Sequence, residues 1–223
     1  MVTVDGPSGS GKGTVSRLLA QHSGWHLLDS GALYRLVAYA GRLAGLAGED
    51  VRGHVQLATR MNVAFDSGAH GERILLDGRE VSTALRDEAV GAGASRVAAW
   101  GDLRAVLLER QHAAARPPGL IADGRDMGTV VFPGAPLKIF LTASAAERAR
   151  RRYNQLKEKD SGVSLAALSR EIAERDRRDA TRPVAPLVPA SDAIVLDSTA
   201  LSAAEVADLI LAYGRARGLW SGG

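Results

Sequence analysis

The sequence predicts an α/β protein with a three-layer core, a small antiparallel insert and a short helical lid. Five short apolar segments alternate with helical patterns, which is typical of a parallel sheet covered by helices. A Gly-rich stretch follows the first apolar segment, and a more polar, alternating region interrupts the pattern between residues 51 and 99. We expect a single unit with its core over about 1–32, 103–147 and 183–223, an insert over about 33–102 and a lid over about 148–182.

The first apolar segment, Met1–Val4, is expected to form a strand, and the spacing of Val15, Leu18 and Leu19 indicates a helix. Between them lies the stretch Gly6-Pro7-Ser8-Gly9-Ser10-Gly11-Lys12-Gly13-Thr14. Glycines let successive backbone N–H groups turn toward one anion, and the helix N-terminus adds its own donors. This context predicts a phosphate-binding loop and a P-loop NTPase-like core, with Lys12 on the outer phosphates and the hydroxyl of Thr14 on Mg²⁺.

The second predicted strand, Trp25–Leu28, leads into a helix for which Ser30 is a plausible N-cap. Tyr34 and Arg35 fall in the first turns of that helix. Because ligands of doubly wound sheets bind beyond the carboxyl ends of the strands, Arg35 is placed to meet a phosphate. The alternative is a surface arginine beside a core tyrosine.

The insert contains a predicted antiparallel meander. Met61–Asp66 and Arg73–Asp77 alternate like half-buried strands, residues 67–71 form the turn between them, and a third short strand lies near Glu80–Val81. Helical patterns resume near Asp87. Ser95 and Arg104 fall in this returning helical segment.

Leu120–Asp123 is expected to be a buried strand that ends in a carboxylate. A carboxylate at a central strand end, beside a phosphate-binding loop, is placed to orient the shell of Mg²⁺. Arg125 and Asp126 follow at once, between two glycines that favour close approach of a ligand. The alternative is that Arg125 and Asp126 simply bond to each other.

Two further strands, Leu137–Leu141 and Ile194–Asp197, complete the five. Two capping boxes, Ser144–Glu147 and Ser202–Glu205, each predict the start of a helix.

Between these strands lies the predicted lid. Arg148 and Arg152 are four residues apart on one helical face. A polar loop over 157–162 joins this helix to a second one, which carries Arg175, Asp179 and Arg182 on one face. A helix, a polar loop and a helix suit a lid that closes over ligands. The alternative is an ordinary helical hairpin with exposed arginines.

Composition limits the classes of protein. The chain has no cysteine, which excludes disulfides and thiolate zinc sites and agrees with a cytoplasmic protein. No stretch approaches the ~20 apolar residues that a membrane span needs. The formal net charge is only +3, and no nucleic-acid-binding module is recognisable. We therefore expect a protein that binds neither nucleic acid nor membrane. We also expect a monomer, because no long apolar stripe is left over.

A phosphate-binding loop indicates a nucleoside triphosphate and no particular reaction. The guanine-binding sequence Asn-Lys-x-Asp is absent, which argues against a GTP-dependent switch. The additional arginines are placed for a second phosphorylated ligand. Two anionic ligands facing each other favour transfer of a phosphoryl group between them, a reaction in which the protein mainly positions reactants and neutralises charge.

The chain also resembles the bacterial cytidylate kinases. The resemblance rests on Asp5-Gly-Pro-Ser-Gly-Ser-Gly-Lys-Gly-Thr14, Leu27-Leu-Asp-Ser-Gly-Ala-Leu-Tyr-Arg35, Leu120-Ile-Ala-Asp-Gly-Arg-Asp-Met-Gly-Thr-Val-Val-Phe-Pro133, Arg175-Asp-Arg-Arg-Asp179 and Val184-Ala-Pro-Leu187. Other monophosphate kinases share the loop but not Asp-Gly-Arg-Asp-Met-Gly. The resemblance implies transfer of the γ-phosphoryl group of ATP, bound with Mg²⁺, to CMP or dCMP.

The resemblance also implies roles for individual residues. Gly6 to Thr14 bind ATP, and Asp123 acts on Mg²⁺, directly or through water. The residues implied to bind the acceptor nucleotide fall into four groups. They contact its base (Ser95, Arg104, Asp126), its phosphate (Arg35, Arg125, Arg175), its sugar and surroundings (Asp179, Arg182), or line the pocket (Ser30, Tyr34). In the lid, Arg148 and Arg152 are expected to contact the transferring phosphoryl group, with Arg151 as an alternative.

Two other functions fit the same sequence. One is a kinase of this fold with another small acceptor, and the other is a nucleotide-sensing module without catalysis. Acceptor screening separates the first, and measurable ADP formation argues against the second.

Overall fold

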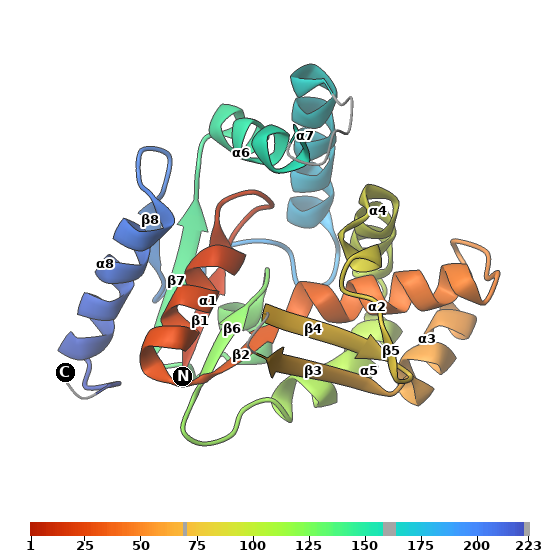
Figure 1. The fold of residues 1–223 in the computed structure, drawn as a ribbon, viewed down its shortest axis with the longest axis horizontal. Coiled ribbons are helices and arrows are strands. Elements are labelled where there is room, and N and C mark those ends of the chain that lie inside the picture. Colours follow the sequence, from red (N-terminus) through yellow and green to blue (C-terminus); the bar gives the residue numbers. More distant parts are fainter. Residues whose placement is uncertain (69–70, 158–163, 221–223) are drawn as a thin grey trace. The chain divides into compact units, whose positions relative to one another are not determined.

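The computed structural model describes residues 1–68, 71–157 and 164–220 (Figure 1). The chain divides into two compact units, of which the first contains residues 1–29 and 111–223 and the second contains residues 30–110. Part of the turn predicted over 67–71, and all but the first residue of the polar loop predicted over 157–162, lie outside the described residues.

Among the described residues, a five-stranded parallel sheet forms the centre of the first unit. Its strands are β1 (Val2–Asp5), β2 (His26–Asp29), β6 (Leu120–Asp123), β7 (Leu137–Thr142) and β8 (Ile194–Asp197), in the order β2-β6-β1-β7-β8. The predicted α/β fold with a five-stranded parallel sheet is confirmed. Because β1 is the central strand, the Gly-rich stretch that follows it leaves from the middle of the carboxyl edge, where ligands bind in such sheets.

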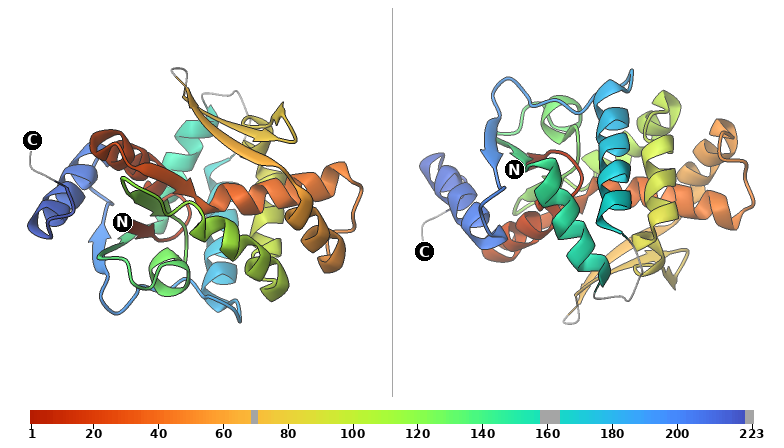
Figure 2. Two further views of the ribbon diagram at one scale, coloured as in Figure 1. Left: turned by 90° about the horizontal axis from the view of Figure 1, so that it is seen from below. Right: turned by 90° about the horizontal axis from the view of Figure 1, so that it is seen from above.

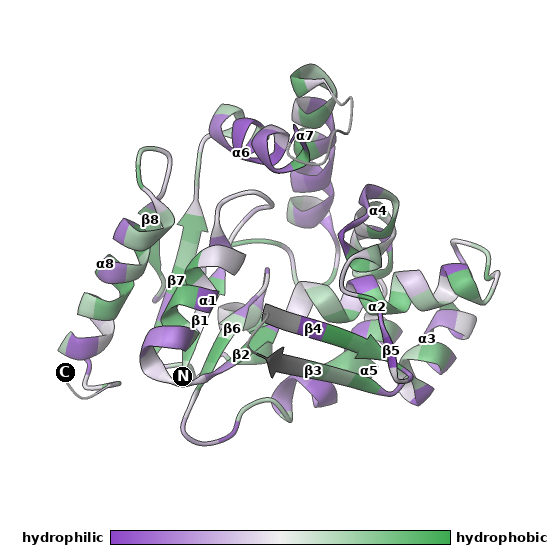
Figure 3. Ribbon diagram, in the orientation of Figure 1, coloured by the Kyte–Doolittle hydropathy of each residue, from purple (hydrophilic) through white to green (hydrophobic). Residues whose placement is uncertain are grey.

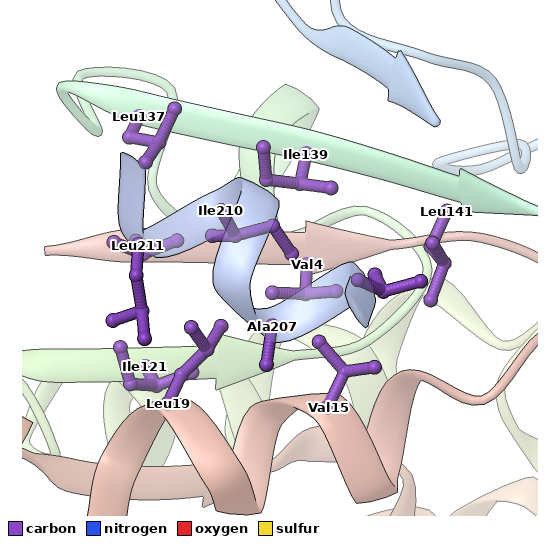
Figure 4. Close-up of a cluster of buried hydrophobic side chains, with 12 residues drawn as sticks. Val4, Val15, Leu19, Ile121, Leu137, Ile139, Leu141, Ala207, Ile210 and Leu211 are labelled. Carbon is purple, nitrogen blue, oxygen red and sulfur yellow. The ribbon is translucent and has the colours of Figure 1, made fainter. Parts of the chain in front are cut away.

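Helices α1 (Lys12–Ser23) and α8 (Ala203–Ala216) pack on this sheet through an apolar core (Figure 4). Val15 and Leu19 of α1 and Ile210 of α8 are at most 1% exposed, as are Val4 and Ile121 of the strands. Burying a side chain of this kind contributes roughly 1.5–3 kcal/mol. The core therefore anchors α1, and with it the loop that precedes α1.

Helices α6 (Ala145–Lys157) and α7 (Leu165–Thr181) lie side by side (Figure 2). Much of α6 is hydrophilic, in contrast to β7 (Figure 3). The capping box predicted for α8 is confirmed. At α6, Ser144 Oγ accepts from the N–H of Glu147 at 3.3 Å, while the Glu147 carboxylate accepts from the guanidinium groups of Arg150 and Arg151.

The second unit combines helices with the predicted antiparallel meander, which is confirmed. Its sheet has the order β3-β4-β5, and α2 packs on α4. The elements are α2 (Ser30–Leu43), α3 (Val51–Arg60), β3 (Val63–Gly68), β4 (Gly71–Leu76), β5 (Arg79–Glu80), the short 3₁₀-helix η1 (Ala84–Arg86), α4 (Glu88–Val97) and α5 (Gly101–His112), whose last two residues belong to the first unit. Within the described residues, every helix is too short or too polar to cross a lipid bilayer.

Candidate phosphate-binding and acceptor-binding residues

The loop between β1 and α1 has a backbone that requires glycine. Gly6, Gly9 and Gly11 have φ angles of 144°, 78° and 95°, in the region that side chains disfavour. A Cβ atom on Gly6 would lie 2.0 Å from the carbonyl oxygen of Leu141. Gly11 is the N-cap of α1, so the free N–H groups of the first helical turn begin where the loop ends.

Lys12 begins α1 and is buried at 5% exposure. Its Nζ donates to the carbonyl oxygen of Pro7 at 2.8 Å. Burial lowers the pKa of Lys12 below its usual value, and the charges of Arg125 and Arg175 lower this pKa further, against the opposing effect of nearby carboxylates. An anion bound at the loop would favour the ammonium form again.

Asp123 ends β6 and is buried at 8% exposure. Its Oδ2 lies 3.4 Å from the place where Gly13 would carry a Cβ atom, so the carboxylate lies beside the residue that precedes Thr14. Burial raises the pKa of Asp123, and the charge of Lys12 opposes that rise. A buried carboxylate and a hydroxyl at the start of α1 are oxygen donors of the kind that suits Mg²⁺ bound together with phosphates.

The sequence predicts no role for Asp5, but the structure shows one. It ends β1, and its two carboxylate oxygens accept from the N–H groups of Met127 and Gly128, each at 2.8 Å. The signal available in the sequence was its place directly before Gly6, within the stretch that carries the resemblance. Its partners lie more than 120 residues away, which no local pattern indicates.

Two charge pairs join the segment after β6 to the end of α7. Arg125 Nε donates to Asp179 Oδ2 at 3.1 Å, and Arg182 Nη2 lies 3.4 Å from Asp126 Oδ1. Arg125 and Asp126 thus bond to other residues that were themselves predicted for the site. Arg182 was predicted to lie within the second lid helix, but α7 ends at Thr181 and Arg182 is its C-cap.

Arg148 on α6 is buried and forms two hydrogen bonds and an ion pair. Its Nε donates to the carbonyl oxygen of Ala143 at 3.0 Å and its Nη1 to that of Ser8 at 3.1 Å. Its Nη2 forms a 2.6 Å ion pair with Asp176 Oδ2 on α7. Arg148 therefore connects the Gly-rich loop with α6 and α7, the two helices of the predicted lid, and Asp176 is a partner that sequence reasoning missed.

Arg151 on α6 also contacts the Gly-rich loop. Its Nη1 donates to the carbonyl oxygen of Ser10 at 3.2 Å and to Ser198 Oγ at 3.0 Å. Ser198 Oγ itself donates to the carbonyl oxygen of Ser10 at 3.0 Å. Arg152, in contrast, bonds through Nη1 to Gln155 Oε1 of the same helix at 3.3 Å.

In the second unit, the structure brings Tyr34 and Arg104 together, because the guanidinium carbon of Arg104 lies 5.7 Å from the centre of the Tyr34 ring. Arg35 Nη1 donates to the carbonyl oxygen of Leu85 at 2.7 Å and lies against Gly91 of α4, the helix that carries Ser95. Two of the remaining predicted side chains are also buried: Ser30 at 3% and Ser95 at 6% exposure.

The family model of cytidylate kinases matches residues 2–216. The chain belongs to the cytidylate kinase family. Relatives named cytidylate kinase share 56% identity over 220 residues in Pseudomonas aeruginosa, covering 98% of this chain and 96% of that one. Another, in Stutzerimonas stutzeri, shares 59% over 213 residues, covering 95% and 93%. The cytidylate kinase family thus accounts for almost the whole chain, including both units.

Proposed function

We propose that this member of the cytidylate kinase family transfers the γ-phosphoryl group of ATP to CMP or dCMP, giving ADP and CDP or dCDP. The observation that carries the proposal is the convergence of Lys12, Arg125 and Arg175, close enough that both arginines lower the pKa of Lys12. Lys12 is buried and the two arginines are partly exposed, and cations that repel one another in this way are stabilised when anions bind among them. A donor triphosphate and an acceptor monophosphate supply these anions.

On the donor side, the loop from Gly6 to Thr14 binds the phosphates of ATP through its backbone N–H groups, and Lys12 neutralises the outer phosphates. Thr14 and Asp123 would hold Mg²⁺, with Asp123 acting directly or through water, and the bound ion would neutralise charge on the phosphate oxygens. Arg148 and Arg151 keep the loop in place through the carbonyl groups of Ser8 and Ser10.

On the acceptor side, the residue types match the parts of CMP. Cytosine offers an amino donor and two acceptors, which suit a carboxylate, a guanidinium group and a hydroxyl. The proposed contacts are to the phosphate from Arg35, Arg125 and Arg175, to the base from Ser95, Arg104 and Asp126, and to the sugar and its surroundings from Asp179 and Arg182, with Ser30 and Tyr34 lining the pocket.

In the reaction, an oxygen of the acceptor phosphate attacks the γ-phosphorus while the bond from that phosphorus to the β–γ bridging oxygen breaks. The second pKa of a phosphate ester is about 6, so the acceptor is largely dianionic at pH 7 and needs no general base. Arg148 and Arg152 are the residues proposed to meet the transferring group, with Arg151 as the alternative. Closure of the lid, residues 148–182, excludes water that would otherwise compete as acceptor.

The test is ADP release from Mg-ATP with CMP, dCMP, UMP, AMP, GMP or no acceptor in parallel. We expect strong release with CMP and dCMP only. We also propose that the protein is a cytoplasmic monomer that binds ATP and CMP and binds neither nucleic acid nor membrane. Release with UMP or AMP instead would retain the kinase and contradict the proposed recognition of cytosine. No release from protein that binds ATP would contradict the proposed reaction.

A further inference from the structure

We propose that Asp5 is a positioning residue for the acceptor base: it fixes the backbone that carries Asp126, so that the Asp126 carboxylate is not used to cap its own helix. The inference rests on the proposed role of Asp126 in binding cytosine. Asp5 directly precedes the phosphate-binding loop, and the proposal gives it a function in binding the acceptor.

The segment after Asp126 is a short π-helix, η2 (Met127–Val131), with Asp126 at its N-cap. The first N–H groups of a helix have no partners within it, and an Asp at the N-cap ordinarily accepts from them with its own side chain. Asp126 makes no such capping hydrogen bond. The N–H groups of Met127 and Gly128 donate instead to the two carboxylate oxygens of Asp5, each at 2.8 Å.

Because Asp5 accepts from these two N–H groups, the Asp126 carboxylate does not cap η2. Asp126 is 2% exposed, and its Oδ1 lies 3.4 Å from Arg182 Nη2. If Asp126 capped η2 itself, its oxygens would turn back toward Met127 and Gly128. The contribution of Asp5 is therefore to satisfy those two donors and to hold the orientation that the acceptor site requires.

The close packing at this junction supports the same conclusion. A Cβ atom on Gly128 would lie 3.3 Å from Asp5 Oδ2 and 3.0 Å from Thr3 Oγ1. Glycine at this position thus lets the backbone approach the Asp5 carboxylate closely. The carboxylate also has a cost, since burial raises the pKa of Asp5 to about 6 and the nearby charge of Asp126 adds to the rise. Among side chains of this size only a carboxylate offers two acceptor oxygens, so Asp5 can satisfy both N–H groups despite that cost.

The experiment is a double-mutant cycle with Asp5→Asn and Asp126→Ala. Asn keeps the shape of Asp but replaces one acceptor oxygen with an amide that faces an N–H donor. We expect Asp5→Asn to lower the ratio of kcat/KM for CMP to that for UMP by about tenfold, an effect typical of losing a hydrogen bond to a charged group. The KM for ATP should stay within about twofold. In the Asp126→Ala background, Asp5→Asn should cause no further loss of selectivity.

Asp192→Asn is the matched control, because it also removes one carboxylate from the first unit, where Asp192 pairs with Lys138 at 2.9 Å. It should leave the selectivity unchanged. Gly128→Ala is a second variant at the same junction and should reproduce the loss of selectivity if Asp5→Asn does not fold, as checked by circular dichroism.

Unchanged selectivity in Asp5→Asn, or a loss that adds fully to that of Asp126→Ala, would overturn the role of Asp5 alone. Unchanged selectivity in Asp126→Ala would overturn the proposed role of Asp126 and the inference with it. A rise only in the KM for ATP would assign Asp5 to the phosphate-binding loop and would also overturn the inference.

Discussion

Arg125 and Asp179 form an ion pair in which Arg125 Nε donates to Asp179 Oδ2 at 3.1 Å, with side chains 20% and 7% exposed. The pair joins the segment after β6 to α7. The charge of Arg125 is also close enough to Lys12 to lower the pKa of that lysine. Asp179 thus partly balances the positive charges of Arg125 and Lys12, as do Asp123 and Asp5 beside Lys12.

The first prediction concerns Arg125→Ala. Removing a guanidinium group that binds the acceptor phosphate should lower kcat/KM for CMP by about 100-fold or more, since charge-assisted hydrogen bonds contribute roughly 1.5–3 kcal/mol. The Kd for ATP should remain within about twofold of wild type. Steady-state kinetics and calorimetric titration with ATP measure the two quantities.

Arg177→Ala is the control for this prediction. Arg177 lies on the same helix as Asp179, is 68% exposed and pairs with Glu174 of α7. An exposed pair of this kind contributes little, so the variant should behave like wild type. Near-normal turnover of CMP by Arg125→Ala would remove Arg125 from the acceptor phosphate.

The second prediction is that Asp126→Ala weakens the preference for CMP over UMP. A carboxylate accepts from the amino group of cytosine but faces an oxygen in uracil, and sites built on hydrogen bonds reject such mismatches strongly. Asp126→Asn should go further and increase the relative use of UMP, because its amide group can donate to that oxygen. The ratio of kcat/KM values for the two acceptors tests both variants, and an unaltered ratio would exclude Asp126 from base recognition.

Much of the fold could be predicted because its signals are local. Leu120–Asp123 is a continuous apolar run that ends in a carboxylate, and Ser202 and Glu205 form their capping box within a single turn. The contacts of the site are not local. Arg148 bonds to Ser8, which lies 140 residues earlier in the chain. The spacing of four residues places Arg148 and Arg152 on one helical face. It does not predict that Arg148 is buried while Arg152 bonds to Gln155 on the same helix.

The third prediction concerns protons taken up when ATP binds at pH 8. Burial lowers the pKa of Lys12, so part of the population is neutral at that pH, and bound phosphates favour the ammonium form. Binding of metal-free ATP should therefore take up protons. Calorimetry in buffers with different enthalpies of ionisation measures this number, and release of protons would contradict the prediction.

Mg²⁺ should reduce the uptake. Burial raises the pKa of Asp123 to about 7, so only a minor fraction of the carboxyl group is protonated at pH 8. A bound cation favours the carboxylate form, so that this fraction releases its protons as Mg-ATP binds. In Asp123→Asn, metal-free ATP and Mg-ATP should take up the same number of protons. A persistent difference in that variant would assign the effect of the metal to another group.

The fourth prediction compares two neighbouring arginines of α6. Arg151 donates to the carbonyl oxygen of Ser10 and to Ser198, whereas Arg150 is 65% exposed and pairs with Glu147. Arg151→Ala should raise the KM for ATP by about tenfold, because the phosphate-binding loop loses a charged hydrogen-bond donor. Arg150→Ala should leave it unchanged. Equal behaviour of the two variants in ATP kinetics would show that the contact with Ser10 does not position the loop.

The fifth prediction concerns the turn at which β1 enters the loop. Gly6 has φ 144°, and a Cβ atom there would lie 2.0 Å from the carbonyl oxygen of Leu141, so Gly6→Ala forces the loop away from β7. The combined strain and clash should cost roughly 3 kcal/mol, or about 10 °C in Tm, and should abolish stabilisation by ATP. Gly134→Ala is the control, because no described atom lies within 4 Å of the added methyl group. Thermal melts with and without ATP test both variants, and a wild-type Tm for Gly6→Ala would mean that the loop tolerates a different backbone.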